Sequence, residues 1–298
     1  YEIMPSLVGS EMCIRDSKEA IVKLNGRIDI KNISDDTAIA AYLVDPAKNE
    51  YTIEKLASEY FGTVIEKPEV KQLSLLDDVE TDRSEYLAKC AVALGVLNDR
   101  IGDKIKENGQ EKLYQEVELP LVTVLAHLEI NGFLVDDNQL KEFADKLGEK
   151  IDALTNEIYM LAGEEFNINS PKQLGVILFE KLELKPVKKT KTGYATNADV
   201  LEKLRDKHPI VNFIMEYRQL AKLKSTYCDG LTAVVNPNTH RIHSVFTQTV
   251  TVTGRLSSTE PNLQNIPTRT ELGREIRKMF VAKDGYVLVD CLLYTSPS

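Results

Sequence analysis

The sequence predicts a multidomain protein in which an α/β part is followed by a helical part and then by further strands. The chain has 298 residues, enough for two or three domains at about 100–200 residues each. Residues 18–117 mix short alternating runs with helical ones, and residues 118–228 are mainly helical. From residue 241 the pattern returns to the alternation that is typical of strands.

Composition is that of an ordinary globular protein. Hydrophobic residues make up 43% and charged residues 28%, which excludes collagen-like and wholly disordered chains. Apolar runs are short and interrupted by charge, so we expect neither a membrane span of about 20 residues nor a secretory signal. The four cysteines lie far apart, without a C-x-x-C pair or a histidine at metal-ligand spacing. We therefore expect reduced thiols, a cytoplasmic location and no zinc site.

Both ends of the chain resemble translated adaptor or cloning sequence. Residues 1–17 (YEIMPSLVGSEMCIRDS) show neither helical nor strand periodicity. Residues 291–298 (CLLYTSPS) interrupt a strand-like run without a turn signal. We interpret both ends as non-native and leave them out of the fold prediction.

Residues 18–117 contain clear helix boundaries. The pair Asp35-Asp36 precedes an apolar helical run, and the acid at its start favours the helix dipole. Thr52 opens a second helix that closes at Gly62, and Asn108-Gly109 closes a third. The expected segments are a strand over Ile28–Ile33, helices over Thr37–Val44, 53–61 and Arg83–Ile105, and a loop over 63–82.

Two apolar stripes in residues 118–228 predict a long antiparallel helical hairpin. They run over Asn138–Leu161 and Pro209–Tyr227, with apolar residues at spacings of three and four. A packed core is sufficient cause for such stripes. Their residues are Leu140, Phe143, Leu147, Ile151, Leu154, Ile158 and Leu161, and Ile210, Phe213, Ile214, Tyr217, Leu220, Ala221 and Leu223.

A helix start between the two stripes could bind an anion. Ser170 is the expected N-cap, Pro171 suits the first helical position, and Gln173 completes a capping box. The unbonded N–H groups and positive dipole end of such a start suit a phosphate. A basic loop follows over residues 185–193, and Thr196–Asp199 opens the next helix with a second capping box. The alternative interpretation of the basic loop is a mobile, solvated linker.

The net charge of −9 hides an asymmetry along the chain. Residues 1–117 carry 15 Lys and Arg against 23 Asp and Glu, a net of −8. Residues 168–283 carry 19 Lys and Arg against 10 Asp and Glu, a net of +9. A basic block of this size can follow a phosphate backbone, although a solvated basic face without a partner remains an alternative.

The last part of the chain carries two predicted strands and a motif between them. His243–Val252 alternates, and Gly285–Val289 (GYVLV) is a short apolar run. The segment Thr251–Thr268 reads TVTGRLSSTEPNLQNIPT. It closely resembles the signature T-x-T-G-R-L-S-S-x-x-P-N-L-Q-N-I-P of family A DNA polymerases.

The resemblance covers about residues 20–290 and implies a domain order. Residues 18–117 resemble part of the 3′–5′ exonuclease domain of the family, which has a ribonuclease H-like fold. Residues 118–240 resemble the helical thumb, and residues 241–290 resemble the start of the palm. The segments that carry this part of the resemblance are residues 33–62, Val117–Phe133, Gly163–Leu174 and Tyr217–Tyr227.

The motif also implies residues that bind DNA. A polymerase must hold any primer–template duplex, and the N3 and O2 acceptors of the minor groove are nearly the same for every base pair. Arg255, Asn262, Gln264 and Asn265 place hydrogen-bond donors on a turn-rich segment, where they could contact these acceptors. The resemblance places Arg255 and Gln264 near the primer-terminal minor groove. A polar loop that bonds its own backbone is the alternative.

Five further residues are candidates for contacts with the DNA backbone. The resemblance places Arg269 at the template strand. Lys222 and Lys224 lie on the polar side of the second stripe helix, where phosphate contact or simple solvation would explain them. Ser170 and Lys172 lie at the helix start between the stripes, and phosphate contact or simple solvation would explain them as well.

The catalytic metal ligands of the family have no counterpart in this sequence. In the family, the strand after Tyr286 leads into D-Y-S-Q-I-E-L-R, whose aspartate binds two Mg²⁺ ions. Asp290 lies two positions before the expected place, which Leu292 occupies, and no histidine is followed by Asp-Glu. Two-metal catalysis needs carboxylates that hold both ions. We therefore expect no catalytic residue and no bound metal in this chain.

The exonuclease ligands are also incomplete. The D-x-E strand of the family would lie before residue 18, and Asp36 alone matches a metal-binding aspartate. The family's Y-x-x-x-D element reads Tyr86-Leu-Ala-Lys-Cys90, with cysteine in place of the acid. We interpret residues 18–117 as a non-editing remnant and Asp36 as a helix-capping acid.

The resulting expectation is a part of a DNA-directed DNA polymerase that acts in replication and repair. The whole enzyme would use Mg²⁺ and dNTPs. This chain would hold the primer–template duplex as a monomer, without catalysis and without a membrane partner. The alternatives are a stand-alone DNA-binding helical module and a 3′–5′ exonuclease.

Overall fold

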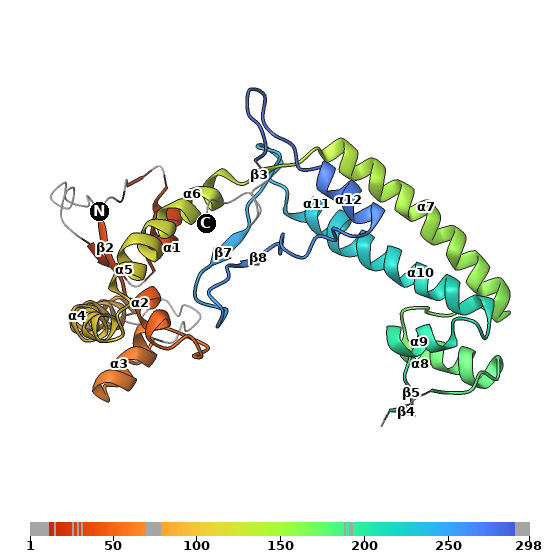
Figure 1. The fold of residues 1–298 in the computed structure, drawn as a ribbon, viewed down its shortest axis with the longest axis horizontal. Coiled ribbons are helices and arrows are strands. Elements are labelled where there is room, and N and C mark those ends of the chain that lie inside the picture. Colours follow the sequence, from red (N-terminus) through yellow and green to blue (C-terminus); the bar gives the residue numbers. More distant parts are fainter. Residues whose placement is uncertain are drawn as a thin grey trace. The chain divides into compact units, whose positions relative to one another are not determined.

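A computed structural model of the chain describes residues 12–14, 16–25, 27–28, 30, 32–68, 79–187, 189–190 and 193–289. They fall into two units, in both of which helices predominate (Figure 1). Unit 1 is residues 1–132 with 243–264, and unit 2 is residues 133–242 with 265–298. The predictions that concern 291–298, Asp290 and Leu292 lie outside the described residues. None of the described helices combines the length and apolar character that crossing a bilayer requires.

Unit 1 packs most of its helices around a main apolar core. Buried side chains from α2, α4 and α6, such as Ala41, Leu97 and Val122, form its centre. The helices are α1 (Ser17–Leu24), α2 (Thr37–Val44), α3 (Ile53–Phe61), α4 (Val79–Glu107), α5 (Glu111–Leu113), the π-helix η2 (Tyr114–Glu118) and α6 (Leu119–Asn131). Strands β1 (Met12–Ile14) and β2 (Ile33–Asp36) pair in parallel, and β7 (Val245–Thr247) and β8 (Ser257–Thr259) pair antiparallel.

The predicted helix boundaries of unit 1 are largely confirmed. Asp36 caps α2 by accepting the N–H groups of Ala38 and Ile39, both at 3.1 Å. Thr52 caps α3, and Gly62 ends it in the left-handed conformation that favours glycine, with φ +67°. The third helix is longer than expected, because α4 begins at Val79, inside the segment that the sequence predicts as loop.

One strand prediction for unit 1 is wrong in position, and another strand was not predicted. The expected strand over Ile28–Ile33 begins only at Ile33, where β1 lies beside it as its partner. Residues 1–17 lack strand periodicity, yet Met12–Ile14 form that partner strand. Pairing with another segment decides where a strand forms, and a short alternating run does not contain that information.

Unit 2 centres on two long helices, α7 (Asp137–Ala162) and α10 (Pro209–Leu223), which lie side by side (Figure 1). The predicted hairpin is therefore confirmed. The other elements are β3 (Phe133–Leu134), α8 (Pro171–Val176), η3 (Ile177–Lys181), β4 (Lys189–Thr190), β5 (Gly193–Tyr194), α9 (Ala198–Leu204), η4 (Lys224–Asp229), α11 (Gly230–Val234), β6 (Arg241–Ile242) and α12 (Glu271–Lys278). Strand β3 pairs antiparallel with β6, and β4 pairs antiparallel with β5.

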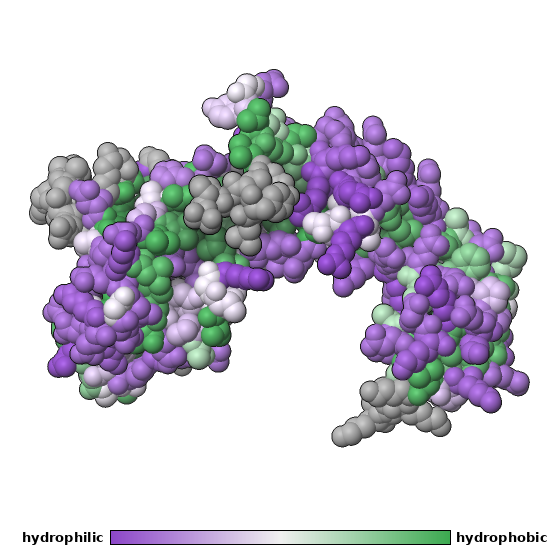
Figure 2. All heavy atoms as spheres, viewed as in Figure 1, coloured by the Kyte–Doolittle hydropathy of each residue, from purple (hydrophilic) through white to green (hydrophobic). Residues whose placement is uncertain are grey.

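Helix α7 shows how the apolar stripe becomes a packed face. Asp136 caps its start by accepting the N–H groups of Asn138 and Gln139, and Gly163 ends it at φ +72°. Leu140 and Ile158, both in the predicted stripe, are almost completely buried. Figure 2 shows hydrophilic side chains over the outer side of this helix. Burial of one face against α10 thus orients the helix.

Several boundaries in unit 2 differ from the sequence prediction. Helix α10 continues past Tyr227 through η4 into α11, so its helical run is longer than expected. The strand predicted over Gly285–Val289 does not form, and no described segment pairs with these residues. The alternating run His243–Val252 contains only the three-residue strand β7, because its partner β8 is equally short.

The two predicted capping boxes also differ. Ser170 caps α8 as expected, but the Gln173 side chain accepts the N–H of Asn167 at 2.6 Å. The Ser170 N–H is already bonded to the Asn167 carbonyl, which explains the exchange. Helix α9 begins after Asn197 without a side-chain cap, because Arg218 bonds the Thr196 carbonyl and keeps that residue outside the helix.

Candidate nucleic-acid interface

The motif residues belong to both units. Arg255, Asn262 and Gln264 lie in unit 1, and the chain enters unit 2 between Gln264 and Asn265. Arg269, Lys222, Lys224, Ser170 and Lys172 lie with Asn265 in unit 2. The structure therefore groups the predicted site residues into two sets, which are described separately below.

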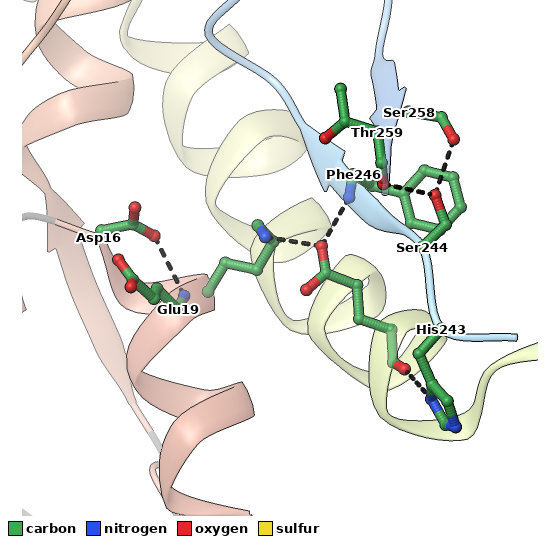
Figure 3. Close-up of polar contacts among 9 residues, drawn as sticks. Asp16, Glu19, His243, Ser244, Phe246, Ser258 and Thr259 are labelled. Carbon is green, nitrogen blue, oxygen red and sulfur yellow. Dashed lines mark hydrogen bonds and ion pairs between the residues drawn. The ribbon is translucent and has the colours of Figure 1, made fainter. Parts of the chain in front are cut away.

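A buried serine pair fixes the first half of the motif. Ser258 is completely buried on β8, and its hydroxyl lies 2.7 Å from the hydroxyl of Ser244 (Figure 3). Ser258 Oγ also accepts the N–H of Leu263 at 3.0 Å, which closes the segment after the strand into a turn. Ser244 Oγ lies within hydrogen-bond distance of the carbonyls of Thr259 and Pro261. These bonds hold the polar segment around Asn262 without an apolar anchor at each position.

A second network joins the strand β7 to α6 and α1. The Glu129 side chain is 8% exposed, and its Oε1 accepts both the Phe246 N–H and the Lys18 ammonium at 2.6 Å. The ring of His243 bonds the backbone carbonyl of Glu129 at 2.8 Å (Figure 3). A buried carboxylate requires such partners, so this network ties β7, the partner of the motif strand β8, to the first part of the chain.

The turn that carries Arg255 has its own bonds. Thr251 Oγ1 donates to the Arg255 carbonyl at 2.6 Å, and the Tyr42 hydroxyl donates to the Thr251 carbonyl at 2.7 Å. Gly254 has φ +74°, a conformation that strains residues with a side chain. The Arg255 side chain itself is exposed. The backbone is thus held while the guanidinium faces solvent.

Asn262 and Gln264 are exposed and bonded within the motif. Asn262 Oδ1 accepts the Gln264 N–H at 3.0 Å, and Gln264 Nε2 donates to the Leu256 carbonyl at 2.9 Å. The Gln264 side chain therefore reaches back to the residue that follows Arg255. Local bonding, which the sequence left open as an alternative, accounts for part of the polarity of this segment.

In unit 2, the helical run after α10 holds the second half of the motif. The Tyr227 hydroxyl on η4 donates to the carbonyl of Asn265. Asn265 and Arg269 have exposed side chains, and α12 follows directly after Arg269. Gly273 lies against Pro267 so closely that a Cβ atom there would meet the Pro267 carbonyl oxygen at 2.4 Å. The segment 265–270 is therefore fixed at both ends.

The four remaining candidates differ in how available they are. Lys222 and Lys172 are exposed. Lys224 is half-buried, and its Nζ pairs with Asp229 at 3.0 and 3.2 Å, so a phosphate would compete with that carboxylate. The Ser170 hydroxyl accepts the Gln173 N–H at 3.4 Å as the cap of α8.

Neither predicted exonuclease position is arranged as a metal ligand. Asp36 is 2% exposed, and its carboxylate accepts the N–H groups of Ser17, Ala38 and Ile39. Burial raises the pKa of Asp36 to about 6, although the hydrogen bonds from Ser17 and Ile39 favour the charged form. Cys90 is buried with Ala57 in an apolar cluster.

No three His, Cys, Asp or Glu side chains gather as metal ligands among the residues that the structure describes. The carboxylate of Asp36 already accepts hydrogen bonds from backbone N–H groups. The Tyr86 hydroxyl donates to Glu54 Oε1 at 2.6 Å, and this pair contains only one carboxylate. These residues do not fit the two-metal site of a polymerase.

The structure also reveals residues that sequence reasoning missed. Ser244 and Ser258 hold the motif turn, while Glu129 and Tyr42 connect it to helices distant in sequence. Glu129 could have been found, because it is the one acid within the predominantly apolar helix of residues 119–131. The role of Tyr42 had no sequence signal, since its partner Thr251 lies 209 residues away.

Comparison with known proteins identifies a matching family and similar sequences. A family model described as DNA polymerase family A matches residues 137–291. The chain is 45% identical over 276 residues to the DNA polymerase I of Bacillus subtilis, covering 90% of this chain and 31% of that protein. It is 46% identical over 279 residues to the DNA polymerase I of Bacillus caldotenax, covering 92% of this chain and 32% of that protein.

A solved structure is also similar. It is the POL domain of Pol1 from M. smegmatis in complex with DNA primer-template and dNTP, with a TM-score of 0.79 and 37% identity. The match covers 92% of this chain and 46% of that one. The chain spans about a third of the length of the curated relatives it matches.

Proposed function

Because the chain belongs to DNA polymerase family A, we propose that it holds a primer–template duplex for template-directed nucleotidyl transfer. The whole protein would be a DNA-directed DNA polymerase of replication and repair, with Mg²⁺ and dNTPs as cofactor and substrates. One observation carries the proposal. The exposed donors of the signature segment stand on a backbone held by the buried Ser244–Ser258 pair.

The proposed domain order follows the family. Residues 18–117 are an exonuclease-like remnant, residues 118–240 are the thumb, and residues 241–290 begin the palm. The α7–α10 hairpin supports the thumb assignment. The capping role of Asp36 and the burial of Cys90 support a remnant that does not edit DNA.

Two kinds of contact with the duplex are proposed. Arg255, Asn262, Gln264 and Asn265 donate to the minor groove, whose N3 and O2 acceptors are common to all base pairs. Arg269 contacts the template strand or its backbone. Lys222, Lys224, Ser170 and Lys172 are phosphate contacts, which position the protein without reading sequence.

This chain is proposed to bind DNA without catalysing transfer. Leu292 stands where the family has its metal-binding aspartate, and no described cluster of acids could replace it. The contribution of its own residues is therefore to bind and orient the duplex. The alternative of a stand-alone DNA-binding module makes the same claim for this chain. It differs only because it has no polymerase in the rest of the protein.

The test is binding of a fluorescent primer–template duplex, measured by anisotropy. Arg255→Ala is expected to weaken binding by roughly 10-fold or more, because a hydrogen bond from a charged donor is lost. Arg100→Ala is the matched control, since it removes an exposed arginine from α4, outside the basic block. Equal effects of the two substitutions, or no binding at all, would overturn the proposal. Template-directed extension of a primer would contradict the absence of catalysis.

A further inference from the structure

Tyr42 makes a polar contact that joins the exonuclease-like part to the signature motif. It lies on α2 and is 3% exposed, and its hydroxyl donates to the Thr251 carbonyl at 2.7 Å. The ring packs edge-on against Tyr51, with centroids 5.9 Å apart. Tyr51 is held in turn by a bond from its hydroxyl to the Asp45 carbonyl at 2.7 Å. The position of the Tyr42 hydroxyl is therefore fixed by packed neighbours.

The turn that receives this bond has little apolar support. Val250 and Val252, on either side of Thr251, are 62% and 65% exposed. From Thr251 the bond to the Arg255 carbonyl continues the connection to the backbone of Arg255. A segment with few buried apolar contacts opens locally at a low free-energy cost, so the few hydrogen bonds that it makes determine how often it opens.

We infer that Tyr42 is a positioning residue for DNA binding, acting through Thr251 on the turn that presents Arg255. The exonuclease-like part would thereby support the grip on the duplex without touching DNA. This inference rests on the proposed function of Arg255. It assigns to residues 18–117 a contribution that does not depend on an exonuclease site.

The first test needs no DNA. Tyr42→Phe removes the hydroxyl and keeps the ring, so hydrogen exchange of backbone amides in a peptide spanning 250–256 should become about 5-fold faster. Tyr86→Phe is the matched control, because it removes a hydroxyl of unit 1 that bonds Glu54 and does not contact the turn. Equal exchange in the two variants would overturn the inference, and so would a uniform increase across unit 1.

The second test is a double-mutant cycle measured by DNA affinity. Tyr42→Phe alone should weaken duplex binding by about 2- to 10-fold, as the loss of one neutral hydrogen bond allows. In an Arg255→Ala background the same substitution should have no further effect, because both residues act through one contact. Additive effects would overturn the inference and leave the proposed function standing. Failure of the unaltered chain to bind DNA would instead contradict the proposed function.

Discussion

At Asp36 the carboxylate accepts three backbone N–H groups and has no partner of the kind that a metal site needs. An aspartate at this position of an exonuclease-like domain can thus serve either as a helix cap or as a metal ligand. Its neighbours decide which. Helices α1 and α2 both direct N–H groups at this side chain, so the acid stabilises two helix starts in one buried position.

Burial of this acid predicts a pH dependence of stability. The pKa of Asp36 is raised from 3.8 to about 6, so the folded chain holds the proton more tightly than the unfolded chain. The free energy of unfolding should therefore fall as pH rises from about 4 to 6, by about 3 kcal/mol from this group, and then level off. Urea unfolding at several pH values, compared with Asp36→Asn, isolates this contribution.

The control is Asp35→Asn, which keeps Asp36 and should keep the decline. If the difference in unfolding free energy between the unaltered chain and Asp36→Asn were constant over this pH range, the raised pKa would be wrong.

At the scale of the element, local signals identified helices and their caps better than strands. The caps at Asp36 and Thr52 depend on residues within four positions, and the sequence contains that information. The run Gly285–Val289 looks like a strand but pairs with no described segment. Helix α9 begins late because Arg218, more than twenty positions away, bonds the Thr196 carbonyl. The residue pattern of a single segment contains no information on such contacts between distant residues.

Two glycines in helices should respond to alanine in opposite ways. In α12, a Cβ at Gly273 would lie 2.4 Å from the Pro267 carbonyl oxygen and 2.5 Å from its Cβ, so Gly273→Ala should destabilise the chain by about 1–3 kcal/mol. In α4, a Cβ at Gly102 would meet nothing within 4 Å. Gly102→Ala should therefore stabilise the chain by about 0.5–1 kcal/mol.

The melting temperatures of the two variants, measured by thermal unfolding, check both predictions. A lower melting temperature for Gly102→Ala, or no change for Gly273→Ala, would contradict the packing described for the respective helix.

At the scale of the whole molecule, charge and motif indicate the same partner. The basic block of residues 168–283, with its net charge of +9, contains the whole signature segment and the exposed lysines of α8 and α10. The sequence could predict the family, because the signature over residues 251–267 is long and specific, while DNA as the partner of this chain stays a proposal. It could not predict the supports of the motif, since Ser244, Glu129 and Tyr42 act through the folded chain.

The charge predicts a steep dependence of DNA binding on salt. If about four phosphates are neutralised, log K should fall with log salt at a slope of roughly −3 to −4. Lys222→Ala should make the slope shallower by about 1. Lys224→Ala should change it less, because Asp229 already pairs with the ammonium group. Anisotropy titrations over a range of salt concentrations measure all three slopes.

A slope near zero for the unaltered chain would rule out phosphate contacts. A larger change for Lys224→Ala than for Lys222→Ala would show that the pair with Asp229 gives way to DNA.

The chain passes between its two units three times, after Gly132, Ile242 and Gln264, so neither unit corresponds to one continuous stretch of the gene. A truncation after Gly132 would leave the carboxylate of Glu129 without the Phe246 N–H and the hydroxyl of Tyr42 without its acceptor. Residues 133–242 behave as an insertion into unit 1. Since the His243 ring bonds the Glu129 carbonyl, a short linker between Gly132 and His243 would excise that insertion and leave the supports of the Arg255 turn in one shorter polypeptide.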